Sequence, residues 1–172
     1  HARAFLNKWQ GHLMVDDYAG YKALFGSSIT ELACLAHIRR KFFDLYAANT
    51  SPIAADVLKR IGQVYAIEAD SKKLTLSQRQ TLRCQKAKPL LESLHAWLLA
   101  TRHTTAPGSA LAKAIDYSLK RWNALIRYAD TGHLPIDNNP VENTIRPIAL
   151  GKKNWMFVGS ERAGVRAAAI QS

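Results

Sequence analysis

The feature that most constrains the fold is a long stretch of helical periodicity in the middle of the chain, from about residue 46 to residue 130. In residues 52–68, apolar side chains recur every three or four positions and share one stripe of a helix: Val57, Leu58, Ile61, Val64 and Tyr65. Pro52 is typical of a helix start. Residues 71–101 predict one or two further helices. We therefore expect the middle of the chain to form a helical bundle.

The last helix predicted in this bundle covers residues 110–132. Its amphipathic pattern continues until Gly132, a residue type that commonly ends helices. The preceding "TTAPGS", residues 104–109, is typical of a loop. Between residues 72 and 88 the only charged side chains are basic: Lys72, Lys73, Arg79, Arg83, Lys86 and Lys88. The predicted bundle therefore contains a basic segment.

The amino-terminal part of the chain has a different pattern. The apolar run "LMV", residues 13–15, is too short for a helix and predicts a buried strand, which ends at Asp16 and Asp17. A short helix is expected next, because four apolar or aromatic residues follow at helical spacing: Tyr18, Tyr21, Leu24 and Phe25. The two ends of the chain are thus expected to mix strands with helices.

Three consecutive cations open the next predicted helix. Residues 29–38 predict a second strand that leads into a helix, and residues 39–49 continue as a helix that begins with Arg39, Arg40 and Lys41. Cations are unfavourable at the positive end of a helix dipole, and a bound phosphate would offset that cost. The alternative interpretation is an ordinary solvated helix face.

The charge balance of the whole chain is strongly basic. Lys and Arg total 24 against 13 Asp and Glu, which gives a formal net charge of +11. Such a balance indicates a polyanionic partner, although a charged surface that only maintains solubility is the alternative. Charges interrupt every long apolar stretch, so none reaches the roughly 20 residues of a membrane helix. No signal-peptide pattern opens the chain, and two cysteines are too few for a disulfide scaffold. A cytoplasmic protein is expected.

The segment "DNNPVENTIRP", residues 137–147, fits the start of a helix. Asn139 is a good N-cap, Pro140 suits the first helical position, and Glu142 falls at the third. An acid at that position interacts favourably with the helix dipole. Arg146, four residues further on, can pair with Glu142, and Pro147 is expected to bend or end the helix. A purely structural role for Glu142 is therefore one interpretation.

A second acid gives Glu142 a functional alternative. Asp16 follows a predicted buried strand, and in open α/β sheets the carboxyl ends of strands are where sites form. Asp16 and Glu142 together have the oxygen ligands that hard divalent cations prefer. A pair of such cations can activate water and stabilise the leaving oxygen during phosphodiester cleavage. The alternative for Asp16 and Asp17 is a turn or a helix cap before Tyr18.

Three blocks of the sequence resemble one known family. These are "VDDYAGYKALF", "CLAHIRRKFFDL" and "LPIDNNPVENTIRPIALGKKNWMFVGS". In their order and spacing they resemble the catalytic region of bacterial insertion-sequence transposases of family sixty-six, which are DDE-type enzymes. The resemblance covers the chain from about Trp9 to Ser160.

The resemblance implies a ribonuclease-H-like core in which two Asp and one Glu bind two Mg²⁺ (or Mn²⁺) ions. The second acid of that pattern corresponds to Asp16 and the Glu of its "NNxxE" block to Glu142. In the family Gly often stands at the position of Asp17, so the two neighbouring acids remain alternatives for the ligand, and we take Asp16. The first acid lies upstream of this chain, so a fragment with two of three catalytic acids is expected.

The expected fold class is α/β and predominantly helical, with a partial ribonuclease-H-like core interrupted by a helical insertion. Residues 1–45 would form the first part of the core and residues 46–130 the insertion. Residues 131–172 would return to the core with the Glu142 helix and the basic "GKKNW" segment. The insertion would account for the 126 positions between Asp16 and Glu142.

Candidate DNA contacts are cationic or aromatic. They are Arg39, Arg40, Lys41, Arg146, Lys152, Lys153 and Trp155. The two lysines after Gly151 can bind phosphates, and Trp155 can stack on an unpaired base. The alternative for Trp155 is a strand in which it fills the core with Phe157 and Val158.

Other kinds of site find little support. Cys34 and His37 have half of a zinc-ligand spacing, and no second pair of ligands completes it, so a buried thiol and a packed imidazole are expected instead. The sequence contains no nucleophile-elbow motif and no phosphate-binding P-loop.

The predicted activity is Mg²⁺-dependent hydrolysis at insertion-sequence ends followed by strand transfer. Transposon ends and target DNA would be the partners, with no membrane partner and with homo-oligomerisation in the DNA complex, in the bacterial cytoplasm at the nucleoid. The alternative from another class is a non-catalytic, basic, helical DNA-binding or assembly module whose acids only cap helices.

Overall fold

The computed structural model describes residues 2–6, 8–17, 19–26, 28–154 and 160–171. Over these residues the protein is mostly helical, with one small parallel sheet. It divides into two units, residues 1–137 and residues 138–172, which are described separately below. The predicted class, mainly helical with a strand component, is confirmed at this level. No helix in the described ranges is long and apolar enough to cross a membrane.

Both predicted strands are present. Strand β1 (Gly11–Val15) pairs in parallel with β2 (Ile29–Ala33), and the register places Val15 opposite Ala33. The 3-10 helix η1 (Ala19–Leu24) lies between them in sequence, where a short helix was predicted, and α1 (Ala2–Leu6) precedes β1. In a parallel pair both carboxyl ends lie at the same edge, so Asp16 and Cys34 follow the strands on one side.

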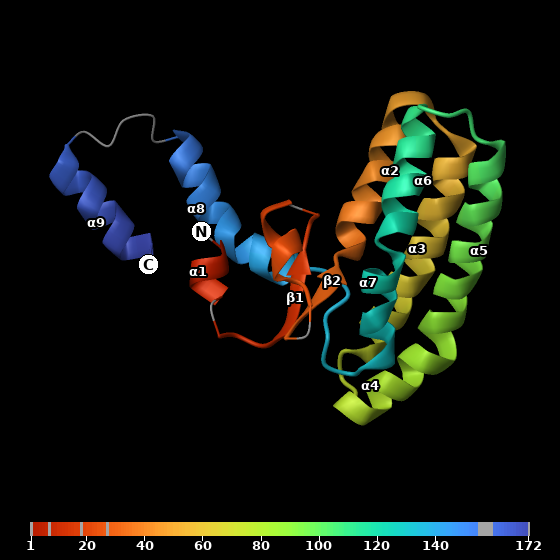
Figure 1. Cartoon of the computed structure of the whole chain (residues 1–172), viewed down its shortest axis with the longest axis horizontal. Helices are drawn as coiled ribbons and strands as arrows, with labels where there is room; N and C mark the ends of the chain where they lie inside the picture. Colours follow the sequence, from red (N-terminus) through yellow and green to blue (C-terminus); the bar gives the residue numbers. More distant parts are fainter. Residues whose placement is uncertain (1, 7, 18, 27, 155–159, 172) are drawn as a thin grey trace. The chain divides into compact units, whose positions relative to one another are not determined.

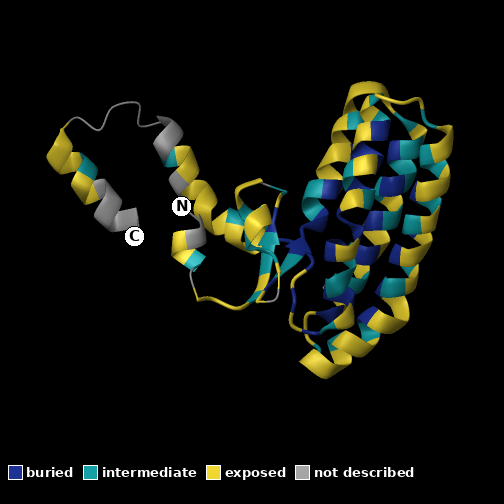
Figure 2. Cartoon of the chain, viewed as in Figure 1, coloured by how far each residue is buried: buried dark blue, intermediate teal, exposed yellow. Residues whose placement is uncertain are grey.

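The predicted bundle is built from four long helices that run side by side in Figure 1: α2 (Leu35–Asn49), α3 (Pro52–Ser71), α5 (Lys88–Thr104) and α6 (Ala110–Lys120). Their inward faces are buried, as the dark blue segments of Figure 2 show. The fully buried aliphatic and aromatic side chains of this core include Leu35, Ile38, Phe42, Val57, Ile61, Leu91, Leu98 and Ile115. Each contributes about 1.5–3 kcal/mol through removal from water.

Side-chain caps begin several of these helices. Ser51 Oγ accepts a hydrogen bond from the backbone N–H of Ala54 at 3.3 Å, and Pro52 occupies the first turn of α3 as predicted. Thr75 and Gln78 form a capping box at α4 (Leu76–Leu82). Ser109 accepts from the N–H of Ala112 at 3.1 Å and starts α6 after the predicted loop. These caps satisfy N–H groups that have no partner inside the helix.

Helix α2 begins earlier than the sequence predicted. Cys34 has extended backbone angles at the N-cap position, and the helix starts at Leu35. Arg39, Arg40 and Lys41 therefore lie in the second turn and not at the start, so the expected conflict with the helix dipole does not arise. The sequence misplaced this boundary because Leu35 and Ile38, which begin the apolar face, directly follow a strand of similar hydrophobicity.

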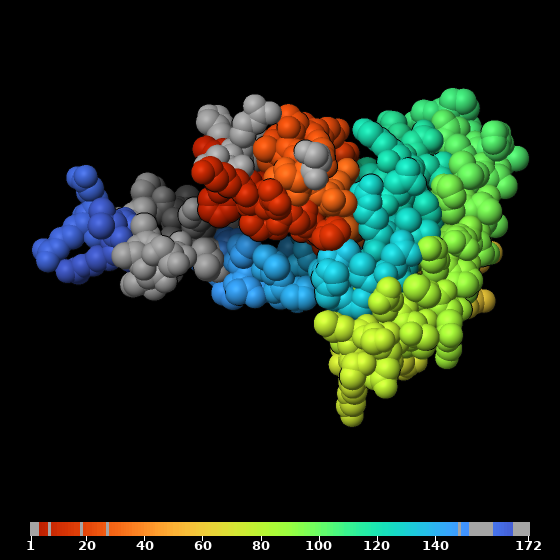
Figure 3. Space-filling view, turned by 60° about the horizontal axis from the view of Figure 1, so that its bottom comes forward, coloured from red at the N-terminus to blue at the C-terminus, as the bar shows by residue number. Residues whose placement is uncertain are grey.

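The amphipathic segment 110–132 is not a single helix. Helix α6 ends at Lys120, and α7 (Trp122–Ile126) and the 3-10 helix η3 (Arg127–Asp130) follow. The interruption is at Arg121, whose φ and ψ of −99° and 4° depart from helical values. Its side chain leaves the bundle and reaches the strands. In Figure 3 the teal surface of the segment that contains this interruption borders the orange surface of the amino-terminal part of the chain.

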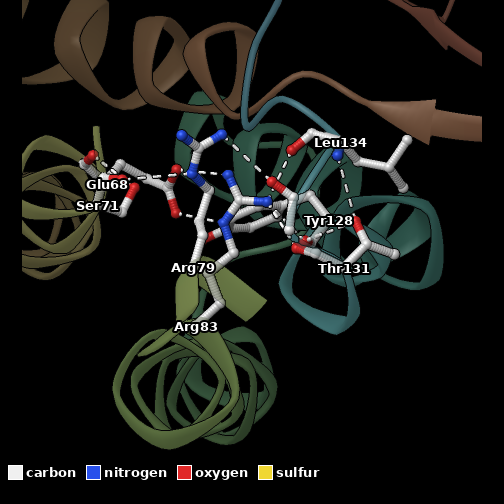
Figure 4. Close-up of polar contacts among 8 residues, drawn as sticks. Glu68, Ser71, Arg79, Arg83, Tyr128, Thr131 and Leu134 are labelled. Atoms are coloured by element: carbon white, nitrogen blue, oxygen red, sulfur yellow. Dashed lines mark hydrogen bonds and ion pairs between the residues drawn. The ribbon is translucent and has the colours of Figure 1, made fainter. Parts of the chain in front are cut away.

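The segment 71–101 contains α4 and α5 joined by the π-helical turn η2 (Arg83–Ala87). This turn directs Arg83 into the protein, where its side chain is 3% exposed. Its guanidinium pairs with Glu68 and donates to the carbonyl oxygens of Tyr128, Thr131 and Leu134 (Figure 4). Part of the basic segment 72–88 is therefore used inside the protein.

The second unit contains α8 (Asn139–Asn154) and α9 (Glu161–Gln171). The backbone N–H of Glu142 donates to the carbonyl of Asn138 at 3.0 Å, so the helix starts one residue earlier than predicted and Glu142 still falls in its first turn. Pro147 lies inside α8 and does not end it. Because proline has no N–H, one internal hydrogen bond is missing there.

Candidate active site at the end of the first strand

Asp16 lies where β1 ends, as the sequence predicted, and it is exposed. Its backbone carbonyl accepts a hydrogen bond from the hydroxyl of Tyr117 in α6 at 3.3 Å. The side chain is thus attached to a short turn that is fixed to the helical bundle. This is the edge of a parallel sheet at which ligands commonly bind.

Asp17 differs from Asp16 in both backbone and side chain. Its φ of 78° lies in the left-handed region, which L residues with a Cβ adopt at a cost and Gly adopts freely. Gly would fit this position without steric cost. The Asp17 carboxylate lies 2.8 Å from Arg121 Nη1 and 3.5 Å from Lys22 Nζ. It is therefore engaged by two cations.

Arg121 joins the bundle to the sheet. Besides Asp17, its guanidinium donates through Nη2 to the carbonyl of Val15 at 3.0 Å and pairs with Glu31 at 2.9 Å. Its side chain is only 3% exposed. A buried guanidinium with this many charged and carbonyl partners is well satisfied, and removing one carboxylate would leave its charge only partly compensated.

Tyr117 connects one predicted DNA contact to the same place. The ammonium of Lys41 lies 4.3 Å from the centre of the Tyr117 ring, and the Arg121 guanidinium lies 5.9 Å from it. Burial raises the pKa of the Tyr117 hydroxyl above its usual range, so this group stays protonated and remains a donor to Asp16. Tyr117 thus contacts Lys41 through its ring and the Asp16 carbonyl through its hydroxyl.

The remaining predicted cations of α2 are on the surface. Arg40 is exposed, and Arg39 is exposed with its guanidinium 5.8 Å from the centre of the Phe43 ring. Beside Lys41, a hollow of about 310 Å³ lies between α2 and α6 and is lined by Lys41, Asp44, Leu45, Ala110, Lys113 and Ala114. The hollow therefore carries one cation from each helix, Lys41 from α2 and Lys113 from α6.

The second unit contains the other predicted acid. Glu142 is half-buried in the first turn of α8, and Arg146 is exposed one turn later. Glu142 and Asp16 belong to different units, each described by itself. Lys152 and Lys153 belong to α8, but their side chains lie outside the described residues, and Trp155, Phe157 and Val158 lie outside them entirely.

The chemistry of these acids fits a hard divalent cation. Asp16 and Glu142 offer carboxylate oxygens, the ligands that Mg²⁺ prefers, and Asp16 is exposed. The neighbouring Asp17 is neutralised by Arg121, which limits repulsion between adjacent carboxylates. Among the described residues, no group of three or more His, Cys, Asp or Glu gathers as a ready-made metal site. Cys34 is buried at the start of α2.

The sequence reasoning missed Arg121, Tyr117 and Glu31. One signal was present for Arg121, because it falls among residues of the buried stripe that includes Ser118, Trp122 and Leu125. A cation in an apolar stripe indicates a buried partner, because burying an isolated charge is strongly unfavourable. The partners themselves, about 90 to 106 positions away, give no local signal.

Comparisons with known proteins identify the family of the chain. The model of the family described as "Transposase IS66 family" matches residues 1–166. The chain therefore belongs to the IS66 family of transposases, which confirms the family predicted from the three sequence blocks.

Two proteins from Sinorhizobium fredii are similar to the chain in sequence. The uncharacterized protein y4jD is 37% identical over 174 residues, which cover 97% of this chain and 34% of the relative. The uncharacterized protein y4hP is 33% identical over 187 residues, which cover 99% of this chain and 34% of the relative. The chain thus spans about a third of the length of these relatives. No solved structure matches the chain.

Proposed function

We propose that this chain is part of the catalytic region of a DDE transposase. The observation that carries the proposal is Asp16, an exposed acid at the carboxyl end of a parallel strand in a chain of the IS66 transposase family. In this proposal β1 and β2 belong to a ribonuclease-H-like core, and the helical bundle is an insertion into it. The proposed division is 1–45 for the first core part, 46–130 for the insertion and 131–172 for the return to the core.

Asp16 and Glu142 are the proposed catalytic and metal-binding acids, together with a third acid outside this chain. Mg²⁺ or Mn²⁺, when bound, would supply charge stabilisation and water activation. Asp17 is not assigned as a ligand, because its carboxylate already neutralises Arg121. The choice between the two neighbours thus favours Asp16 on physical grounds.

The proposed reaction has two steps. Water attacks the phosphorus of a phosphodiester at the end of the element, the P–O3′ bond breaks, and a 3′ hydroxyl is released. That hydroxyl then attacks a phosphorus of target DNA and displaces its 3′ oxygen, so that one phosphodiester replaces another. No covalent bond to the protein forms in either step.

DNA is the proposed partner, and the cations of α2 are the proposed phosphate contacts of the first unit. Lys41 has the most direct structural support, because it lies against Tyr117, which in turn contacts Asp16. Arg39 and Arg40 are exposed on the same helix. Arg146, Lys152, Lys153 and Trp155 remain proposed contacts of the second unit. Assembly as a homo-oligomer on DNA in the bacterial cytoplasm completes the proposal.

The test uses the full-length protein with a DNA duplex carrying the element end. Asp16→Asn and Glu142→Gln are expected to reduce Mg²⁺-dependent nicking by on the order of 10³-fold or more while DNA binding is retained. Asp116→Asn is the control, because Asp116 is an exposed acid paired with Arg102 on the bundle surface. Nicking by Asp16→Asn at the wild-type rate would sink the catalytic assignment and favour the non-catalytic DNA-binding module.

A further inference from the structure

A single arginine contacts the residues on both sides of Asp16. Arg121 donates to the carbonyl of Val15, the residue before Asp16, at 3.0 Å. It also donates to the carboxylate of Asp17, the residue after Asp16, at 2.8 Å. We propose that Arg121, assisted by Tyr117, is a positioning residue that holds Asp16 in place for divalent-cation binding. This inference rests on the proposed metal-binding role of Asp16.

Tyr117 completes the restraint at Asp16 itself. Its hydroxyl donates to the carbonyl of Asp16 at 3.3 Å, so three consecutive residues of the strand end are tied to the segment 117–121. These contacts restrain the strand end from which the Asp16 side chain projects. Metal ligands that are held in this way bind more tightly, because less conformational entropy is lost when the ion binds.

Electrostatics favour a positioning role over that of a counter-ion. The charge of Arg121 is balanced by two carboxylates, those of Asp17 and Glu31, and Lys22 adds a second cation at Asp17. Arg121 therefore forms ion pairs with the residue that follows Asp16 and with Glu31 of the adjacent strand. An arginine that paired with Asp16 directly would compete with a metal ion.

Two departures from regular structure belong to this arrangement. The helix is interrupted at Arg121, which allows its side chain to leave the bundle surface toward the sheet. Asp17 adopts a left-handed conformation that costs a non-glycine residue about 1–2 kcal/mol. The ion pair of its carboxylate with Arg121 offsets this cost. Both departures involve residues of this contact, which is typical of functional sites.

The structure also provides a matched control. Arg127 in η3 donates to the backbone carbonyl of Glu31 at 2.6 Å, so it too links the helical segment to the sheet. That contact is at β2 and involves none of the three residues at the end of β1. A purely structural role predicts similar effects for Arg121 and Arg127, whereas positioning predicts an effect of Arg121 alone.

The experiment measures Mn²⁺ affinity of the full-length protein by electron paramagnetic resonance of the free ion, together with thermal unfolding. Arg121→Lys keeps the charge and loses the forked geometry, and it is expected to weaken Mn²⁺ binding about 10-fold or more. Tyr117→Phe removes one hydroxyl from a partly exposed side chain and should weaken binding about threefold. Arg127→Lys should leave Mn²⁺ affinity unchanged, even if the substitution lowers the melting temperature of the protein.

The outcomes separate this inference from the proposed function. Unchanged Mn²⁺ affinity in Asp16→Asn would remove the proposed metal-binding role of Asp16 itself. Weaker binding in Asp16→Asn combined with wild-type affinity in Arg121→Lys and Tyr117→Phe would overturn only the positioning role. Equal losses in Arg121→Lys and Arg127→Lys would also overturn it. If Arg121→Lys fails to fold, the Mn²⁺ affinities of Tyr117→Phe and Arg127→Lys are compared instead. Weaker binding in Tyr117→Phe alone supports the positioning role, and equal affinities overturn it.

Discussion

Arg83 and Glu68 form a two-point ion pair, with Nε 2.9 Å from Oε1 and Nη2 2.7 Å from Oε2. The remaining donor group, Nη1, reaches three backbone carbonyls, those of Tyr128, Thr131 and Leu134, between 2.7 and 3.2 Å away. One buried side chain thus ties α3 and the π-helical turn to the segment that leads out of η3. The planar guanidinium reaches Glu68 and the three carbonyls at the same time, and the single ammonium of a lysine could not make all of these contacts.

We expect Arg83→Met to destabilise the protein by about 3–5 kcal/mol, because Glu68 would be left largely buried without its cation and three carbonyls would lose the hydrogen bond from Arg83. Urea unfolding followed by circular dichroism measures the change. Lys88→Met is the control, since the Lys88–Asp130 pair is on the surface and should contribute little. A loss no larger for Arg83→Met than for Lys88→Met would contradict the structural role of the buried pair.

Gly132 illustrates a close backbone approach. A Cβ added there would overlap the backbone carbonyl of Leu76 at the start of α4, whereas a Cβ added at Gly62 would meet nothing. We expect Gly132→Ala to destabilise by about 3 kcal/mol through overpacking. Gly62→Ala, inside α3, should stabilise by about 0.5–1 kcal/mol. Urea denaturation of the two variants in parallel checks both signs, and equal midpoints would refute the packing argument.

Alkaline pH should unfold the protein through its buried tyrosines. Burial raises the pKa of Tyr128, and burial together with the hydrogen bond to Asp137 raises that of Tyr65. A raised pKa means that folding stability is fully present below pH of about 10 and falls as pH rises further, because the unfolded chain releases these protons first. Each tyrosine contributes a slope of up to about 1.4 kcal/mol per pH unit.

Tyr128→Phe tests this linkage directly. Between the ordinary tyrosine pKa of about 10 and the point of alkaline unfolding, the variant should lose stability less steeply than the wild type. Urea midpoints at a series of pH values give the slope, and absorbance at the wavelength of tyrosinate follows ionisation. An identical slope in the variant would show that Tyr128 is not linked to unfolding.

The left-handed backbone at Asp17 predicts an order of stability between two substitutions that both lose the ion pair with Arg121. Asp17→Gly should be more stable than Asp17→Ala by about 1–2 kcal/mol, because only Gly adopts this conformation without steric cost. The difference between their free energies of unfolding in urea excludes the loss of the ion pair, because both variants lose it. Equal stability would mean that the turn relaxes when the carboxylate is removed.

Local patterns predicted much of this fold. The run at residues 13–15, the two strands, the helix start at Pro52 and the loop before α6 were visible because hydrophobic periodicity and turn residues are local properties. The position of Asp16 at a strand end was predictable for the same reason. The interruption at Arg121 was missed, because its cause lies in contacts with strands about 90 to 106 residues away.

Gly132 and the basic segment 72–88 show the same limit. Gly132 was interpreted as a helix-ending residue, whereas the segment before it ends in η3 and Gly132 approaches the backbone of Leu76. Arg83 was indistinguishable in sequence from its exposed basic neighbours. Its burial depends on the π-helical turn and on Glu68, fifteen positions earlier. The candidate acids were recognisable by type and position, and the groups that hold them were not.

The contact of Arg121 with Asp17 and Glu31 has a consequence for how such sequences diverge. Exchange of the arginine alone removes the buried cation that Asp17 and Glu31 share, and exchange of either acid alone removes part of the compensation of a buried charge. Substitutions at these three positions are therefore expected to be correlated. Family members with a neutral residue at position 121 should also lack an acid at position 17 or 31. Natural variation would then preserve the turn as a unit, although its parts come from distant stretches of the gene.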